Sequence, residues 1–283
     1  MTHKTILTVV GMDCTKQQLD PLLEIARSLE ARLSVAVVAV APSANVYASA
    51  IPYGAMTVAD DFGLNIRETI SELGAKVNSI EVILQKADIA GDVNAVYSEL
   101  ANLDAEIAKR AMVCDLAMLP KSNTLEDNIY SRVLSGVLFR SPIGVIVADE
   151  AAAIIPKPKR VFVAWNSSLP SSRAIHQALP VLQRADEVIV GLFDPIMSKN
   201  ADGEDPGADV SAWLSHHGCN VTLQQRPTGG RGVATSIVEA VTETGSDLVV
   251  MGAYGHSKLQ QWMFGGTTTA MLDGAKVPVF FAH

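Results

Sequence analysis

The sequence predicts an α/β protein of two tandem doubly wound sheets, each mostly parallel and five-stranded, with helices on both faces. Three observations predict this fold class. The 283 residues are enough for about two domains. Short apolar segments alternate with segments of helical periodicity. The order of these segments in the first part of the chain also recurs in the second, as an internal repeat. Such alternation indicates right-handed crossovers between parallel strands.

Each copy of the repeat opens with a strand, a helix and a second strand. The opening strands are Lys4–Val10 and Lys159–Trp165, and the second strands are Ser34–Val40 and Glu187–Phe193. These strands are apolar on both faces, as a sheet covered on both sides requires. The helices between them carry apolar residues at helical spacing: Leu19, Leu22, Leu23, Ala26 and Leu29 in the first copy, and Ala174, Ile175, Ala178, Leu179 and Leu182 in the second.

Residues 62–87 read as one long helix, although Ile80–Leu84 alone would suit a strand. The helical interpretation rests on an apolar stripe with alternating steps of four and three, which is typical of a helix face. We expect this stripe to pack on its own sheet, with a coiled-coil partner as the alternative, and place the third strand near Val93–Tyr97. The stripe consists of Ile66, Ile70, Leu73, Val77, Ile80, Leu84 and Ala87.

The last two strands of each copy complete the repeat. The segment Asp115–Leu119 corresponds to Asp247–Met251, and Ser141–Val147 corresponds to Lys276–Phe281. A proline-containing linker, residues 150–158, then separates a first domain, 1–149, from a second, 159–283. Because the terminal strands 143–147 and 277–281 are apolar and lie at predicted sheet edges, we expect them to pair and join the halves as a pseudo-symmetric pair.

Composition excludes several classes of function. The net charge of −8 argues against general nucleic-acid binding, and the basic run 157–160 reads as part of a solvated linker. The apolar stretches have strand length, far short of the ~20 residues that span a bilayer, and no signal peptide is apparent. The three cysteines are far apart, which favours reduced thiols and a cytoplasmic location.

A glycine-rich segment near the C-terminus is the strongest functional signal. An apolar run that ends at Met251 leads directly into Gly252, with Gly255 three positions later and Gly265, Gly266 and Thr267 further on. Glycines let backbone N–H groups approach an anion, and a helix that begins at the second glycine pair adds unpaired donors and a favourable dipole. The pattern predicts a phosphate-binding loop.

The spacing Gly252-x2-Gly255-x9-Gly265, followed by a small residue and threonine, resembles the nucleotide loop of the universal stress protein family. The resemblance covers nearly the whole chain as two unequal copies. It implies Rossmann-like domains of the adenine nucleotide alpha hydrolase type, which bind ATP or AMP or have lost that ability. It also implies a nucleotide site at the strand ends, formed by Ala164, Asn166, Leu192, Met251, Gly252, Gly255, Gly265, Gly266 and Thr267.

Two of these positions depart from the family pattern. The resemblance places Asn166 where members commonly carry an aspartate, and Gly266 where nucleotide-binding members carry serine or threonine; Thr267 then supplies the hydroxyl. Replacing a carboxylate by an amide removes a charge and weakens the case for a divalent ion. Leu192 corresponds to a position whose backbone commonly meets adenine, although its apolar side chain also suits plain core.

The other candidate residues carry weaker signals. Arg231, in the glycine-rich loop 228–232, suits a phosphate or a carboxylate, but a surface turn is the preferred interpretation. Residues His256 and Ser257 lie near the phosphate loop without a visible catalytic partner. The pair His216–His217 reads as an exposed helix C-terminus rather than a metal site, because adjacent helix residues do not face one direction.

The first copy lacks the glycines, so we expect it to be degenerate. After Leu119 it continues with Pro120 and an acidic stretch, which leaves Asp13 without a phosphate loop. We therefore expect a non-enzymatic stress-response protein that binds an adenine nucleotide in its second half and forms a possible homodimer. The alternatives are a structural tandem that binds no nucleotide, a flavoprotein of related fold, and an ATP-using enzyme whose Ser-Gly-Gly or His-x-Gly-His motif is not present.

Overall fold

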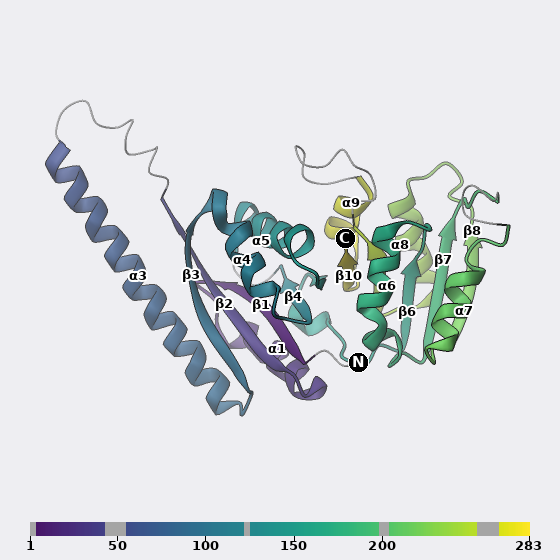
Figure 1. Ribbon diagram of the computed structural model, residues 1–283, viewed down its shortest axis with the longest axis horizontal. Helices are drawn as coiled ribbons and strands as arrows, with labels where there is room; N and C mark the ends of the chain where they lie inside the picture. The colour runs from purple at the N-terminus through teal and green to yellow at the C-terminus, as the bar shows by residue number, and fades with distance from the viewer. Residues whose placement is uncertain (1–3, 43–54, 122–124, 198–203, 254–265) are drawn as a thin grey trace. The chain divides into compact units, whose positions relative to one another are not determined.

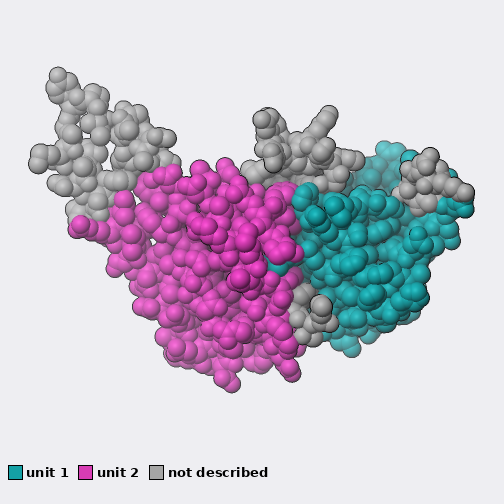
Figure 2. All heavy atoms as spheres, in the orientation of Figure 1, with its two compact units in different colours: residues 1–3, 143–283 teal, residues 4–142 magenta. Residues whose placement is uncertain are grey.

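The computed structural model describes residues 4–42, 55–121, 125–197, 204–253 and 266–283, without side chains for 55–64 and 152. The chain divides into two compact units, which Figure 2 colours separately. Unit 2 is Lys4–Pro142, and unit 1 contains Ile143–His283. Strands and α-helices alternate in both units, except that only a short 3-10 turn separates β5 from β6 (Figure 1). The predicted α/β fold is confirmed.

Unit 2 holds four strands of the first repeat in the order β3-β2-β1-β4, with every pairing among them that the structure describes parallel. Helices α1 and α3 contact each other, as do α4 and α5. Right-handed crossovers place these two pairs on opposite faces of the sheet. The elements are β1 (Thr5–Gly11), α1 (Lys16–Leu29), β2 (Arg32–Ala41), α3 (Ala55–Lys86), β3 (Gly91–Glu99), α4 (Leu103–Ala111), β4 (Leu116–Pro120) and α5 (Asp127–Arg140).

Unit 1 has the strand order β5-β10-β9-β6-β7-β8, parallel except for the β5–β10 pair. Helices α6 and α7 share one face, where the rings of His176 and Trp213 stack at 4.4 Å, and α8 contacts α9. The elements are β5 (Gly144–Ala148), β6 (Arg160–Ala164), α6 (Leu169–Leu182), β7 (Glu187–Phe193), α7 (Ala208–His216), β8 (Val221–Arg226), α8 (Val233–Thr244), β9 (Leu248–Gly252), α9 (Gly266–Gly274) and β10 (Val279–Ala282).

The internal repeat extends to individual hydrogen bonds. In unit 2, the carboxylate of Asp115 accepts the backbone N–H groups of Lys4 and Thr5, both at 2.8 Å. In unit 1, the carboxylate of Asp247 accepts the N–H groups of Lys159 and Arg160 at 2.7 and 3.1 Å. Each aspartate therefore links the start of the first strand of its repeat to the start of the fourth strand of the same repeat.

The predicted pairing of the two terminal strands is confirmed within unit 1. β5, from the first repeat, runs antiparallel to β10, with Val147 opposite Val279 and Val145 opposite Phe281. This pairing explains why the compact units divide at Pro142, whereas the sequence analysis ended the first domain at residue 149. The border at Pro142 reflects packing, because β5 packs with the second repeat, whereas the border at residue 149 marks the end of the first copy of the repeat.

The long helix predicted over 62–87 is present as α3, which spans Ala55–Lys86 and contacts β2 and β3. Leu73, Ile80 and Leu84 of its apolar stripe are at most 4% exposed, while Ile70 is 49% exposed. The stripe therefore packs on its own sheet at Leu73, Ile80 and Leu84, as expected, but not at Ile70. Strand β3 begins two residues before the predicted third strand and ends two residues after it.

The three cysteine side chains are free and buried. Burial raises the pKa of Cys14 and of Cys114 to about 11, so both remain thiols at neutral pH. Among the described residues, no helix combines the length and apolar character needed to cross a bilayer.

Candidate functional site

The candidate site lies where the strand order of unit 1 reverses direction. From β6 the chain proceeds to β7 on one side, while β9 lies on the other, so β6 and β9 flank the switch point where open α/β sheets bind ligands. Ala164, the last residue of β6, lies opposite Met251 of β9 and Gly191 of β7. The register thus brings Ala164, Met251, Gly252 and Leu192 to the carboxyl ends of three neighbouring strands.

Asn166 lies two residues after the end of β6 and is exposed. Its side-chain oxygen accepts hydrogen bonds from two hydroxyl groups, those of Ser168 at 2.7 Å and of Ser171. Ser168 is the N-cap of α6, and its hydroxyl oxygen accepts the N–H of Ser171 at 3.4 Å. This ordered turn fixes the orientation of the Asn166 amide.

Gly252 has a packing role at the end of β9. A Cβ built on this residue would lie 2.5 Å from backbone atoms of both Pro170 and Ser171, in the first turn of α6. The glycine therefore permits the close approach of α6 to the end of β9. Because this contact joins residues that are far apart in the sequence, the glycine pattern did not identify it; that pattern predicted only a phosphate-binding loop.

Helix α9 begins at Gly266, as the glycine pattern predicted. Because β9 and β10 are parallel, the helix between them starts on the carboxyl side of the sheet. Gly266 is exposed, Thr267 is half-buried, and a Cβ on Gly266 would meet nothing within 4 Å. Four residues singled out from the sequence lie outside the described residues: Gly255, His256, Ser257 and Gly265.

Leu192 has a side chain that is only 1% exposed, so that side chain belongs to the core. Apolar side chains are nevertheless exposed at the same edge of the sheet. They are Leu169 at the start of α6, Ile196 and Met197 after β7, and Val233 at the start of α8. Sequence reasoning did not select them, because a single apolar residue at a helix start carries no distinctive pattern.

The loop 228–232 is a turn held by its own side chains. Gly229 and Gly230 both have positive φ, 62° and 79°. Arg231 donates to the carboxylate of Glu239 at 2.9 Å and to the carbonyl oxygen of Thr228 at 3.1 Å. The preferred interpretation as a surface turn is confirmed, and Arg231 pairs with a carboxylate.

Asp194 connects the end of β7 to this loop. Its carboxylate accepts the hydroxyl of Thr228 and, at 3.1 Å, the N–H of Thr228. These two donors lower the pKa of Asp194. The carboxylate therefore has a structural role: it links the end of β7 to the loop 228–232. Sequence reasoning missed this contact because Asp194 and Thr228 belong to different elements.

The corresponding edge of the first repeat is built differently. Asp13 is exposed and lies two residues before Thr15, the N-cap of α1, as Asn166 lies two residues before Ser168. Pro120 ends β4 where Gly252 ends β9, and the hydroxyl of Tyr130 donates to the carbonyl oxygen of Leu119 at 2.8 Å. A tyrosine from α5 thus engages this strand end.

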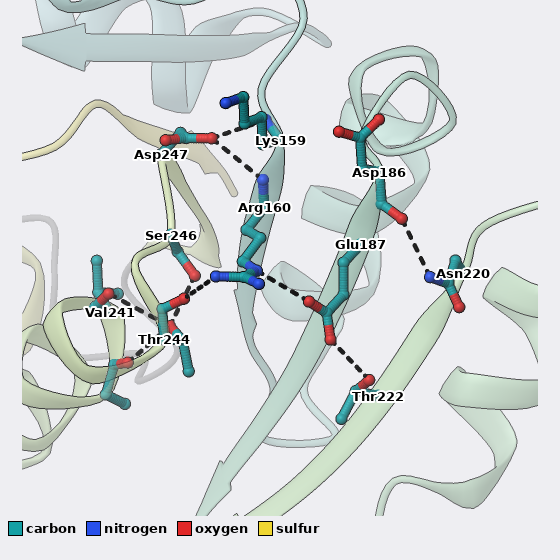
Figure 3. A network of polar contacts seen from close by, with 11 residues as sticks. Lys159, Arg160, Asp186, Glu187, Asn220, Thr222, Val241, Thr244, Ser246 and Asp247 are labelled. Carbon is teal, nitrogen blue, oxygen red and sulfur yellow. Dashed lines mark hydrogen bonds and ion pairs between the residues drawn. The ribbon is translucent and has the colours of Figure 1, made fainter.

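A polar network occupies the opposite, amino-terminal edge of unit 1 (Figure 3). Arg160 contacts Glu187 at 3.0 Å and the carbonyl oxygen of Thr244 at 3.1 Å, and Glu187 accepts the hydroxyl of Thr222 at 2.9 Å. A hollow of about 460 Å³ lies here. We interpret this edge as structural, because Arg160 pairs with Glu187, Asp247 holds backbone N–H groups, and ligands of parallel sheets bind at the carboxyl ends.

The residues that the structure describes contain no group of three or more histidine, cysteine, aspartate or glutamate side chains able to hold a metal ion. The expected helix end at His216–His217 is confirmed, since α7 ends at His216 and Gly218 follows with φ of 84°. The ring of His217 stacks on Trp213 at 4.2 Å.

Comparison with known proteins identifies the family signature and the fold. Residues 223–283 match the model of the universal stress protein family. No match was found among curated protein sequences. A universal stress protein structure from Archaeoglobus fulgidus is similar over 98% of this chain and 97% of its own, with 17% identity and a TM-score of 0.62. A structure from Pseudomonas aeruginosa, described as a universal stress protein, is similar over 99% and 93%, with 13% identity and a TM-score of 0.56.

Proposed function

We propose that this chain is a stress-response protein of the universal stress protein type that binds one adenine nucleotide, ATP or AMP, in its second repeat. The proposal is supported by the match of residues 223–283 to the universal stress protein family model and by the similarity of the whole fold to tandem structures of that family. The observation that carries the proposal is the register at the switch point. It brings Ala164, Leu192 and Met251 to one edge, the edge at which α9 begins.

The composition of this edge suits the parts of a nucleotide. The exposed apolar side chains of Leu169, Ile196 and Val233 offer surface for a base, and Asn166 offers a polar group. The start of α9 offers backbone donors and a favourable dipole for phosphate, with the Thr267 hydroxyl beside them. In the first repeat, Pro120 lacks an N–H donor, which supports a single site per chain.

We further propose that the protein turns over its nucleotide slowly or not at all. Among the described residues at the switch point, Asp194 is committed to Thr228 and Arg231 to Glu239, and Asn166 is neutral. General acid–base catalysis needs a titrating group within reach of the reacting atoms. A cytoplasmic location and a homodimer remain part of the proposal, the first consistent with the free thiols.

Calorimetry on the full chain tests the proposed function. ATP or AMP is expected to bind with one site per chain, while GTP binds more weakly. Thr267→Ala is expected to weaken binding about two- to tenfold, the effect of one lost hydrogen bond. Asp13→Ala in the first repeat is the matched control and should leave binding unchanged. Absence of heat with both adenine nucleotides would favour the alternative, a structural tandem that binds none.

A further inference from the structure

A second hollow, of about 500 Å³, lies at the amino-terminal edge of the sheet in unit 2. Residues from the starts of three parallel strands and from the end of α4 line it, among them Thr5, Arg32, Ser34, Asp92, Arg110 and Val113. It is the counterpart, in the first repeat, of the hollow beside Arg160 in unit 1, since both lie where the first and second strands of a repeat begin.

The register shows how the charges differ between the two hollows. Thr5 lies opposite Arg32 in unit 2, as Arg160 lies opposite Glu187 in unit 1. The second repeat thus has an ion pair of 3.0 Å where the first has a threonine and an arginine (Figure 3). Arg32 is exposed, and its side chain forms no ion pair or hydrogen bond with any residue that the structure describes.

Arg110 brings a second incompletely paired guanidinium group to this hollow. Its Nη2 donates to the carbonyl oxygen of Ala95 at 3.1 Å. Its Nε–H, in contrast, is buried and has no acceptor within the described part of the chain. A buried donor without an acceptor is destabilising, and native proteins seldom retain one that neither water nor a ligand reaches.

The lining of the hollow carries one positive charge in excess, three cationic side chains against two acidic ones, in a protein of net charge −8. Lys109 pairs with Glu106 at 2.7 Å. Asp92 accepts hydrogen bonds from two neutral groups, the hydroxyl of Ser34 at 3.1 Å and the amide of Asn94 at 2.5 Å. A single excess charge suits a monoanion, and the Asp92 carboxylate disfavours a ligand with a second negative charge.

We propose that this hollow is a second binding site, for a short-chain monocarboxylate. The ligand's carboxylate pairs with the guanidinium groups of Arg32 and Arg110 and accepts the buried Nε–H, because guanidinium donors match the geometry of a carboxylate. Val113 lines the same hollow and is 79% exposed, so it offers apolar surface to the chain of the ligand.

This site goes beyond the proposed nucleotide site and lies in the other unit. Ligands of parallel sheets usually bind at the carboxyl ends of the strands, so the topology alone does not favour a site here. The support comes from the unpaired donors of Arg32 and Arg110. In the corresponding hollow of unit 1, Arg160 is instead paired with Glu187.

NMR titration of the full chain with sodium butyrate tests the inference, with the arginine Nε–H signals as the readout and Arg110→Lys to identify the Arg110 signal. Butyrate should shift that signal saturably, because its carboxylate supplies the acceptor. Arg32→Gln should weaken butyrate binding at least about tenfold, the effect of a lost charge-assisted hydrogen bond. Inorganic phosphate at pH 8, a dianion, should bind more weakly than butyrate.

Two controls separate a specific site from general attraction of anions. Arg67→Gln removes the same charge from the exposed side of α3 and should leave butyrate affinity unchanged. Thr5→Arg combined with Arg32→Glu rebuilds the ion pair of the second repeat and should abolish binding, while circular dichroism checks that each variant is folded.

A shift that does not saturate would overturn the inference. Equal losses in Arg67→Gln and Arg32→Gln, or tighter binding of phosphate than of butyrate, would overturn it as well. Calorimetry with ATP keeps the two proposals apart, because Arg32→Gln should leave nucleotide binding unchanged.

Discussion

At the scale of single residues, the carboxyl edge of unit 1 separates side chains that hold the fold from those available to a ligand. Gly252 permits α6 to approach β9, and Asp194 holds Thr228. The amide oxygen of Asn166 accepts hydrogen bonds from Ser168 and Ser171, and within the described residues its NH₂ group makes none. Substitutions at these positions should therefore have distinguishable effects, on stability for the first group and on binding for the second.

Gly252→Ala should destabilise unit 1. The added Cβ would overlap backbone atoms of Pro170 and Ser171, and relief of such overlap typically costs about 1–3 kcal/mol. Gly266→Ala is the control, because a Cβ there meets nothing within 4 Å. Differential scanning calorimetry should show a lower melting temperature for the first variant only. Equal melting temperatures for the two variants would show that Gly252 has no packing role.

The Asp194–Thr228 contact should depend on pH with a defined sign. Because the folded pKa of Asp194 is lowered, the contact stabilises the fold above the unfolded pKa of about 3.9 and loses its effect as pH falls through the folded value. Urea unfolding of the natural chain and Asp194→Asn should therefore differ at pH 7, with a smaller difference near pH 3. A difference that grows toward acid pH would contradict this account.

At the scale of elements, the packing of α3 agrees with the sequence pattern of its apolar stripe at three positions. A helix face with steps of three and four is a strong signal, and Leu73, Ile80 and Leu84 are buried as it predicts. The loop 228–232 was likewise predictable, because adjacent glycines favour the positive φ that Gly229 and Gly230 adopt. Periodic and local signals thus specify elements well.

Leu73→Ala should destabilise unit 2 far more than Ile70→Ala. Leu73 is 2% exposed, and truncating a buried leucine costs about 2–5 kcal/mol. Ile70 is 49% exposed, so the same truncation there should change stability by less than about 1 kcal/mol. The two variants can be compared by calorimetric melting of the full chain. A larger effect at Ile70 would mean that this face of α3 is covered in solution.

At the scale of the whole molecule, the pairing of β5, from the first copy of the repeat, with β10, from the second, joins the two copies. The pairing was predictable because both strands are apolar at predicted edges, although the sequence alone did not give the register that places Val147 opposite Val279. The Asn166–Ser171 cluster and the Gly252–Pro170 contact were not predictable. They depend on how α6 sits against β9, which periodicity does not encode.

Cysteine exchange can verify the register that joins the repeats. With the three native cysteines replaced by alanine, Val147→Cys and Val279→Cys should form an intramolecular disulfide, because the two residues lie directly opposite in an antiparallel pair. Val147→Cys with Phe281→Cys is the control, since Phe281 lies opposite Val145 and is displaced by two positions. Equal cross-linking of both pairs would contradict the register.

The central claim is that one nucleotide binds per chain, at the carboxyl edge of the second repeat. Photo-cross-linking of the full chain with an azido derivative of ATP, followed by peptide mapping, tests this claim most directly. The account predicts that labelled peptides come from residues 143–283, and that excess ATP prevents their labelling. Labelling of residues 4–142 that ATP prevents equally well would contradict it.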